Sequence, residues 1–154
     1  MIKLLVLLLI ILPVNADVLP DKSLSPGKTN PILTKEVICS KNFTTKDYRN
    51  VSSGLKQKIY KEYNMEPHKG ICGGVEGCEV DHIIPLTIGG SNDKENLWVQ
   101  PFNGQLNAHD KDKLEVRLHR LVCSGIIDIQ QAQNEISSDW VKAFNKYILN
   151  KQIR

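Results

Sequence analysis

An aspartate and a histidine stand side by side on a short apolar run near the middle of the chain. Asp81 and His82 precede the apolar residues 83–86, and a loop with two glycines at 89–90 leads to a second apolar run that follows Asn96. A carboxylate is a ligand for a hard cation such as Mg²⁺, and an imidazole accepts a proton near neutral pH. The pair therefore indicates metal-assisted hydrolysis of a phosphate ester.

Hydrolysis of a phosphodiester needs two kinds of help. The attacking water must lose a proton, and the charge that develops on the phosphate and the leaving oxygen must be stabilised. His82 is the candidate general base, and Asp81 is the candidate ligand of a divalent ion that keeps open positions for the phosphate. Adjacent strand residues point to opposite faces, so a twist or a bulge must bring these two side chains to one site.

The elements around the pair are predicted to be a hairpin followed directly by a helix. The apolar runs at 80–84 and 97–99 indicate two short antiparallel strands. The connection at 87–95 is longer than a tight turn, and such loops carry function when rigid strands hold them. A helix is predicted from about Leu106 to Val122, and Gly125 is a suitable stop.

Two further helices are predicted on either side of this unit. Ser52 or Ser53 is a plausible N-cap for a helix to about Tyr63, and Asp128 caps the last helix. In the last helix, apolar residues recur every three or four positions and predict a buried stripe: Ile129, Ala132, Ile136, Trp140, Ala143 and Tyr147. The chain is therefore expected to have an α+β fold.

The N-terminus has the pattern of a secretory signal peptide over residues 1–16. Lys3 precedes an unbroken apolar run at 4–12, and small residues follow at 14–16. A membrane anchor is the alternative, but the run is shorter than the roughly 20 apolar residues that span a bilayer. The sequence thus predicts a periplasmic or secreted protein that is free of the membrane after cleavage. Residues 17–35 are polar and proline-containing, which predicts a flexible leader before a single domain at 36–154.

The cysteine content agrees with export, because an even number of cysteines in an exported chain indicates disulfides. The glycine-rich loop between Cys72 and Cys78 can close without strain, which favours this pair and leaves Cys39 with Cys123. A structural zinc site is disfavoured because the chain has no C-x-x-C pair. The formal net charge of +3 is too small to indicate a nucleic-acid partner by itself.

Several of these features together resemble the HNH endonucleases, the ββα-metal class. They are Asp81-His82, the glycine loop at 89–90, Asn96-Leu97 and a helix that opens with Asn-Ala-His-Asp-Lys at 107–111. The resemblance is good over residues 79–113 and looser towards the end, where the chain is similar to small exported bacterial proteins of this type. It implies an endonuclease that acts on DNA, with RNA as an alternative substrate. The small surface and the absence of a separate DNA-reading module predict low sequence specificity, and the chain is expected to be a monomer. The implied cofactor is one divalent ion, Mg²⁺ first, with Mn²⁺, Zn²⁺ or Ni²⁺ as alternatives.

The resemblance also implies roles for individual residues. His82 resembles the general base and Asp81 the first metal ligand, while Asn96 resembles the asparagine that fixes the loop or the base imidazole. The second ligand should come from the following helix, where Asn107 and His109 are the alternatives. They lie two residues apart and about 200° apart on a helix, so one ion cannot take both. Imidazole is the more competent ligand, which favours His109.

Basic residues on the same helix are candidate contacts to phosphates. They are Lys111, Arg117 and Arg120, and their alternative role is ion pairing with Glu115 or Asp112. A second function remains open beside the nuclease. In it, the chain is a catalytically inactive, disulfide-stabilised ββα module that only binds its partner.

Overall fold

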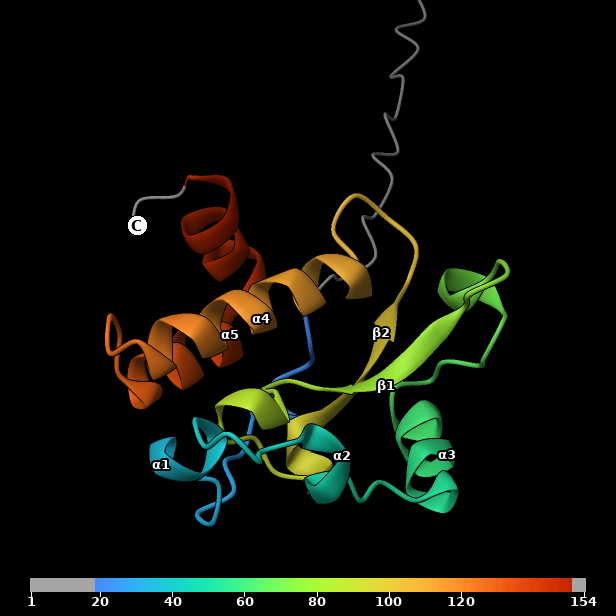
Figure 1. The fold of residues 1–154 in the computed structure, drawn as a ribbon. Helices are drawn as coiled ribbons and strands as arrows, with labels where there is room; N and C mark the ends of the chain where they lie inside the picture. The colour runs from blue at the N-terminus through green and yellow to red at the C-terminus, as the bar shows by residue number, and fades with distance from the viewer. Residues whose placement is uncertain (1–18, 151–154) are drawn as a thin grey trace, which may run out of the picture.

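The computed structural model describes residues 19–150 (Figure 1), so the predicted signal peptide at 1–16 lies outside the described residues. Its centre is a two-stranded antiparallel sheet in which β1 (Cys78–His82) pairs with β2 (Leu97–Pro101). The register sets Asp81 opposite Trp98 and His82 opposite Leu97. Helices surround this hairpin, so the predicted α+β class and the antiparallel pairing are confirmed.

The helix that follows the hairpin is α4 (Ala108–Cys123), close to its predicted bounds. Asn107 is its N-cap, and the Asp110 side chain returns to the backbone of Asn107 to complete a capping box. The predicted last helix is α5 (Ile129–Phe144), capped by Asp128. Asp139 has non-helical backbone angles, so α5 is kinked there and continues into a π-helical turn at Asn145–Leu149.

Two hydrophobic clusters hold the helices to the hairpin. The larger one contains Trp98 of β2 together with the inner faces of α4 and α5, and the predicted stripe of α5 contributes its members Ala132, Ile136, Trp140, Ala143 and Tyr147. The smaller cluster joins Val80 and Val99 to Ile59 of α3 (Ser53–Glu62). Figure 1 shows α3 and α4 on different sides of the hairpin. Asp81, opposite Trp98, therefore belongs to the α4 side of the sheet.

The described part of the predicted leader, residues 19–35, lies against the hairpin and its loop. Ser25 donates a hydrogen bond from Oγ to the Leu97 carbonyl, Gly27 N–H donates to the Glu95 carbonyl, and Thr29 forms an isolated β-bridge with Gly90. Leu33 is buried in the larger cluster. This packing differs from the expected flexible leader, because backbone pairing with a distant loop leaves no periodic signal in the sequence.

Two short helices were not predicted: α1 (Lys35–Ile38) and α2 (Thr45–Tyr48). Each has a single turn, which is too short for an apolar period to be visible. Further single turns of 3₁₀ helix occur at Gly70–Cys72, Leu86–Ile88 and Lys94–Asn96. The last two lie in the long connection of the hairpin and shape it.

Two disulfides tie these parts together, and both have the favoured pairing. Cys72–Cys78 closes a loop beside β1, and Cys39–Cys123 joins the end of α1 to the end of α4 across a sequence separation of 84. Disulfides of this kind indicate an oxidising environment, outside the cell or in the periplasm. Within residues 19–150, no helix combines the length and the apolar character needed to cross a bilayer.

Candidate active site

A small cavity of about 90 Å³ lies where β1, α2 and α4 meet. Asp81 and His82 line it from the end of β1, and Glu115 lines it from α4. The remaining lining comes from α2, from the residue that follows α2 and from the turn after β1: Thr45, Arg49, Pro85, Leu86 and Thr87. Both halves of the Asp-His pair thus border one cavity, although neighbouring residues of a flat strand face opposite ways.

Beneath the cavity, Lys111 joins β1 to α4 through a buried ion network. Its Nζ lies 2.6 Å from Asp81 Oδ2 and 2.5 Å from Glu115 Oε1, and it donates to the His82 carbonyl at 2.7 Å. All three ammonium hydrogens therefore have acceptors, and the side chain is only 1% exposed. Lys111 was a candidate phosphate contact, but its burial excludes that role. The alternative, an ion pair with Glu115, is confirmed.

The network carries more negative than positive charge. Burial acts to raise the pKa of Asp81, but the Lys111 ammonium outweighs it and holds that pKa below its usual value. Burial also raises the pKa of Glu115 to about 7, because one lysine cannot compensate two carboxylates fully. Glu79 lies nearby, and burial together with the Asp81 charge raises its pKa to about 7 as well. A further cation would be stabilised here.

The His82 imidazole is held by an asparagine of the hairpin loop. His82 Nε2 lies 3.1 Å from Asn92 Oδ1. The Asn92 amide is oriented by backbone groups, since its Nδ2 donates to the Tyr48 carbonyl at 2.8 Å and its Oδ1 accepts from Asn50 N–H at 3.2 Å. An amide oxygen only accepts hydrogen bonds, so Nε2 carries the proton and Nδ1 keeps its lone pair.

Burial is the main reason that the pKa of His82 is lowered. The ring is therefore neutral at pH 7, as a proton acceptor must be. Sequence reasoning did not single out Asn92. The sequence feature that pointed to Asn92 was its place in the long connection between the two predicted strands.

Asn96 acts on the loop and not on the imidazole. Its Oδ1 accepts from the backbone N–H of Ile84 at 2.9 Å and of Lys28 at 3.2 Å. Its Nδ2 donates to the carbonyls of Ile84 and Ser91 at 2.9 and 2.8 Å. The side chain is fully buried, so these bonds lock the loop onto the end of β1. The two roles that the resemblance allowed to one asparagine are thus divided between Asn96 and Asn92.

Neither of the helix residues expected to bind metal lies at this cavity. Asn107 caps α4, and its Oδ1 accepts from the His109 N–H. The His109 ring packs on Phe102 with ring centroids 5.1 Å apart, and its Nε2 lies 3.4 Å from Glu76 Oε2. The α4 carboxylate that borders the cavity belongs to Glu115, which is six residues and about 9 Å further along the helix.

Glu115 had a signal in the sequence that was not used. With about 100° per residue, Lys111 falls within about 20° of Leu118 on the helix, whereas His109 falls on the opposite side. Leu118 belongs to the buried stripe of α4. The phase of that stripe therefore favours Lys111 and Glu115 over His109 as the inward-facing polar residues. Arg117 and Arg120 do not line the cavity either, and Arg120 is exposed.

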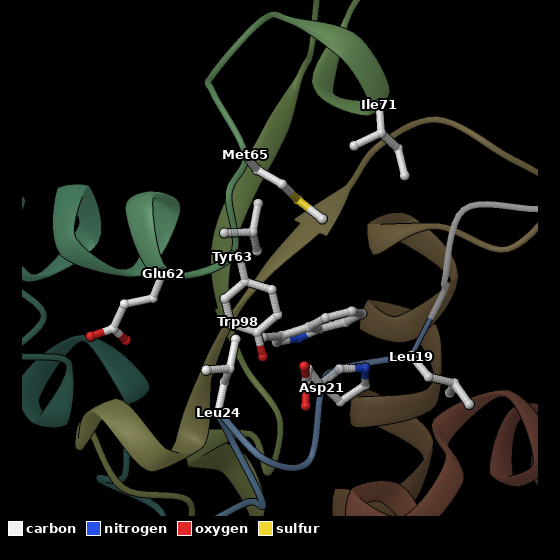
Figure 2. Close-up of a pocket in the computed structure, with 10 residues that line it drawn as sticks. Leu19, Asp21, Leu24, Glu62, Tyr63, Met65, Ile71 and Trp98 are labelled. Atoms are coloured by element: carbon white, nitrogen blue, oxygen red, sulfur yellow. The ribbon is translucent and has the colours of Figure 1, made fainter.

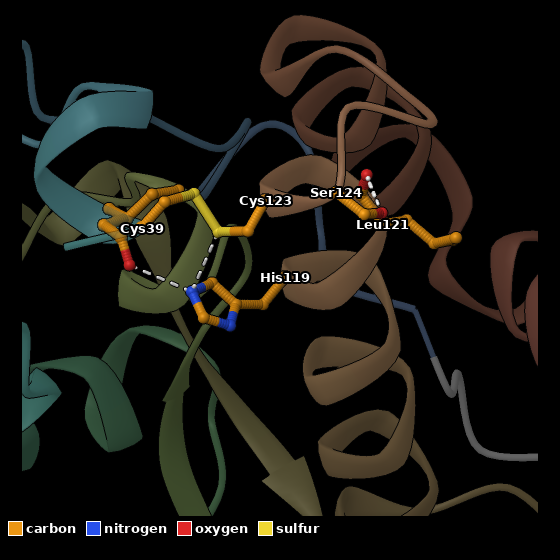
Figure 3. The surroundings of a disulfide bond; sticks show 6 residues. Cys39, His119, Leu121, Cys123 and Ser124 are labelled. Carbon is orange, nitrogen blue, oxygen red and sulfur yellow. Dashed lines mark hydrogen bonds between the residues drawn. A yellow bond between two sulfur atoms is a disulfide. The ribbon is translucent and has the colours of Figure 1, made fainter. Parts of the chain in front are cut away.

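The described residues contain a larger cavity and a cysteine–histidine cluster away from this site. A larger cavity of about 670 Å³ (Figure 2) is lined by the segment that begins at Leu19, by the end of α3 and by Trp98 and Val99 of β2, without the Asp-His pair. His119 lies beside the Cys39–Cys123 disulfide, with Nε2 3.4 Å from Cys123 Sγ (Figure 3). The three potential ligand atoms lie within 4.8 Å of one another, but the sulfurs are bonded to each other and offer no thiolate to a metal.

Comparisons with known proteins returned no relative. No protein-family model matches the chain, and neither a curated protein nor a solved structure matches it. The function is therefore argued from the site and from the motif resemblance alone.

Proposed function

We propose that this protein is an exported, divalent-metal-dependent endonuclease of the HNH type. Its substrate would be DNA, with RNA as the alternative, and its sequence preference would be weak. The observation that supports this is the common cavity of Asp81, His82 and Glu115. In this proposal β1, β2 and α4 form the ββα-metal core.

The metal ligands in this proposal are Asp81 and Glu115, in place of Asn107 or His109. Two carboxylates suit a hard cation such as Mg²⁺ or Mn²⁺. Lys111 contacts one oxygen of each carboxylate, so each has a second oxygen that Lys111 does not contact. Burial raises the pKa of Glu115 to about 7, and a bound cation would favour its charged form. When bound, the ion would stabilise the charge that develops on the phosphate and the leaving oxygen.

His82 would act as the general base through Nδ1. Asn92 accepts the proton-bearing Nε2–H, which leaves the Nδ1 lone pair for the attacking water. The backbone bonds of Asn92 and Asn96 hold the ring and the loop before any substrate arrives. Such preorganisation is what a general base needs if it is to act at a defined atom.

One observation favours the second function, a catalytically inactive binding module. The Lys111 ammonium already lies between the two carboxylates and satisfies one oxygen of each. If the ammonium fully takes the place of a metal ion there, the protein would fold but would not cleave a phosphodiester. Metal-ion binding and cleavage therefore have to be measured separately.

The direct test is nicking of a supercoiled plasmid by the purified chain with Mg²⁺ or Mn²⁺, with and without a chelator. The proposal predicts cleavage that the chelator abolishes and that His82→Ala lowers by at least ~100-fold, within the range of general-base catalysis. Full activity in His82→Ala would overturn the mechanism. A folded wild-type protein that cleaves neither DNA nor RNA would support the binding module.

The ligand assignment has its own test, calorimetric titration with Mn²⁺. Glu115→Gln should weaken Mn²⁺ binding by at least ~10-fold, the loss that follows even when an outer partner of a ligand is removed. His109→Ala is the matched control on the same helix and should bind Mn²⁺ as the wild type does. The reverse result would restore His109 as the ligand.

A further inference from the structure

Arg49 is the one lysine or arginine among the residues that line the Asp81–His82 cavity. It follows α2 directly and lies 29 residues before Cys78, the first residue of β1. It lines the same cavity as His82, Asp81 and Glu115. The cavity thus has an acidic wall, formed by Asp81 and Glu115, and a cationic residue that faces the same space.

The backbone on either side of Arg49 is linked to the imidazole of His82 through Asn92. Asn92 donates to the carbonyl of Tyr48 and accepts from the N–H of Asn50, the two residues on either side of Arg49, and the same amide oxygen contacts His82 Nε2. One asparagine therefore sets both the ring of His82 and the peptide segment that presents Arg49. This coupling fixes the backbone at Arg49 relative to the imidazole of His82.

The guanidinium of Arg49 forms no ion pair within the described residues, although its charge also acts on the carboxyl groups of Glu79 and Asp112. None of the ion pairs between residues 19 and 150 includes Arg49. Lys111, by contrast, has both of its carboxylates within 2.6 Å. An arginine that is anchored through its backbone and has a free guanidinium beside a polar cavity is suited to an anionic ligand.

The volume and the charge of the cavity indicate which anionic group it can hold. A volume of about 90 Å³ leaves room for a group of the size of a phosphate. A phosphate that approaches His82 would meet the negative charges of Asp81 and Glu115. A cation that lines the same cavity offsets this repulsion, and a guanidinium binds two phosphate oxygens at once.

We propose that Arg49 binds the phosphodiester group that is presented to His82. The inference rests on the proposed function for the identity of the substrate, and it adds a residue outside the hairpin and α4. A lysine at this position would keep the charge but lose the bidentate geometry. Arg49→Lys should therefore recover only part of the effect of Arg49→Ala.

The first experiment measures anion binding without catalysis. Inorganic phosphate is titrated at pH 7, with and without Mg²⁺, while the His82 ring signals are followed by NMR. The wild type should show saturable shifts, Arg49→Ala should weaken binding by at least ~10-fold, and Arg49→Lys should be intermediate. Lys46→Ala, an exposed lysine of α2 that does not line the cavity, should bind as the wild type does. Equal binding in Arg49→Ala, or no shift in the wild type under either condition, would overturn the proposal.

The second experiment uses plasmid nicking. Arg49→Ala should lower kcat/KM by at least ~100-fold, Arg49→Lys should recover a tenth of the wild-type value at most, and Lys46→Ala should stay within about twofold, in keeping with what transition-state charge stabilisation contributes. Arg49 is exposed, so these variants should keep the wild-type Tm. If the wild type does not nick, the proposed function fails, while the phosphate titration still decides the role of Arg49.

Discussion

At the scale of single residues, Lys111 is the residue whose role changed most between sequence and structure. As one of several lysines and arginines on α4 it resembled a surface contact to phosphate, yet it is buried and satisfies three acceptors. A buried charge of this kind is tolerated only when it is paired. Lys111 therefore positions Asp81 and Glu115, and the network it forms connects the strand that carries His82 to α4.

Replacement of Lys111 by methionine should destabilise the fold by about 3–5 kcal/mol, because it leaves two buried carboxylates without their counter-charge. Chemical denaturation at pH 7 measures the change. Lys113→Met is the control, since Lys113 pairs with Asp110 at the surface and its side chain is 62% exposed. That variant should stay within about 0.5 kcal/mol of the wild type. A change below about 1 kcal/mol in Lys111→Met would contradict the buried network.

At the scale of elements, the connection between β1 and β2 is a rigid part of the site. Asn96 closes it with three hydrogen bonds, two to Ile84 and one to Ser91, and the chain passes so tightly that Gly90 lies directly against the Ile84 carbonyl. A Cβ at position 90 would lie 1.7 Å from that carbonyl oxygen and 2.9 Å from Asn96 Nδ2. The loop that holds Asn92 against His82 thus depends on a residue without a side chain.

Gly90→Ala should lower the free energy of unfolding by at least about 2 kcal/mol, because the backbone must move away from Ile84. Gly54→Ala provides a control of opposite sign. Position 54 lies in α3 with nothing within 4 Å of an added Cβ, so alanine there should stabilise the protein by about 0.5–1 kcal/mol. Both values come from urea denaturation. Tolerance of alanine at 90 would disprove the close approach.

The junction of α5 with the π-helical turn makes stability depend on pH. Lys146 Nζ lies 2.8 and 2.9 Å from the two carboxylate oxygens of Glu135. Partial burial acts to raise the pKa of Glu135, but the hydrogen bonds from Lys146 and Gln131 outweigh it and hold this pKa below its usual value. The unfolded chain therefore binds the proton more readily, so the stabilisation is present at neutral pH and is lost as the pH falls through the folded pKa of Glu135.

Glu135→Gln should cost about 0.5–1 kcal/mol at pH 7, since the pair is partly exposed. The difference in Tm between the wild type and this variant should shrink as the pH is lowered from 7 to 3. Glu95→Gln removes the same charge outside this ion pair and corrects for net charge. A difference that grows on acidification would show that the sign is wrong.

At the scale of the whole molecule, long-range hydrogen bonds and a disulfide position the segments around the Asp81–His82 cavity. Residues 19–35 lie against the hairpin, and the Cys39–Cys123 disulfide joins the end of α1 to the end of α4. The segment that follows Cys39 carries α2 and Arg49 to the cavity that His82 lines. The parts of the candidate site that come from outside the hairpin and α4 are therefore positioned by these ties.

The two disulfides should differ in what they contribute. In the chain-entropy description, the bond that spans 84 residues is worth roughly 4–5 kcal/mol and the bond that spans 6 residues about 2 kcal/mol. The double variant Cys39→Ala with Cys123→Ala should thus lose about twice as much stability as Cys72→Ala with Cys78→Ala. Denaturation under non-reducing conditions measures both. An equal loss would mean that loop length does not govern their effect.

The sequence by itself determined whatever depends on neighbours along the chain. The Asp81-His82 pair, the two strands, the capped helices α4 and α5 and the favoured disulfide pairing all follow from residue type, period or short loop closure, and the structure has each of them. Which side of α4 meets β1 depends on tertiary packing, and this packing brings Glu115, not His109, to the cavity. It also brings Asn92 to His82 from the hairpin connection and Arg49 to the same cavity from a segment 33 residues earlier in the chain. Such contacts depend on how whole elements pack, and packing across 30 or more residues leaves no local pattern in the sequence.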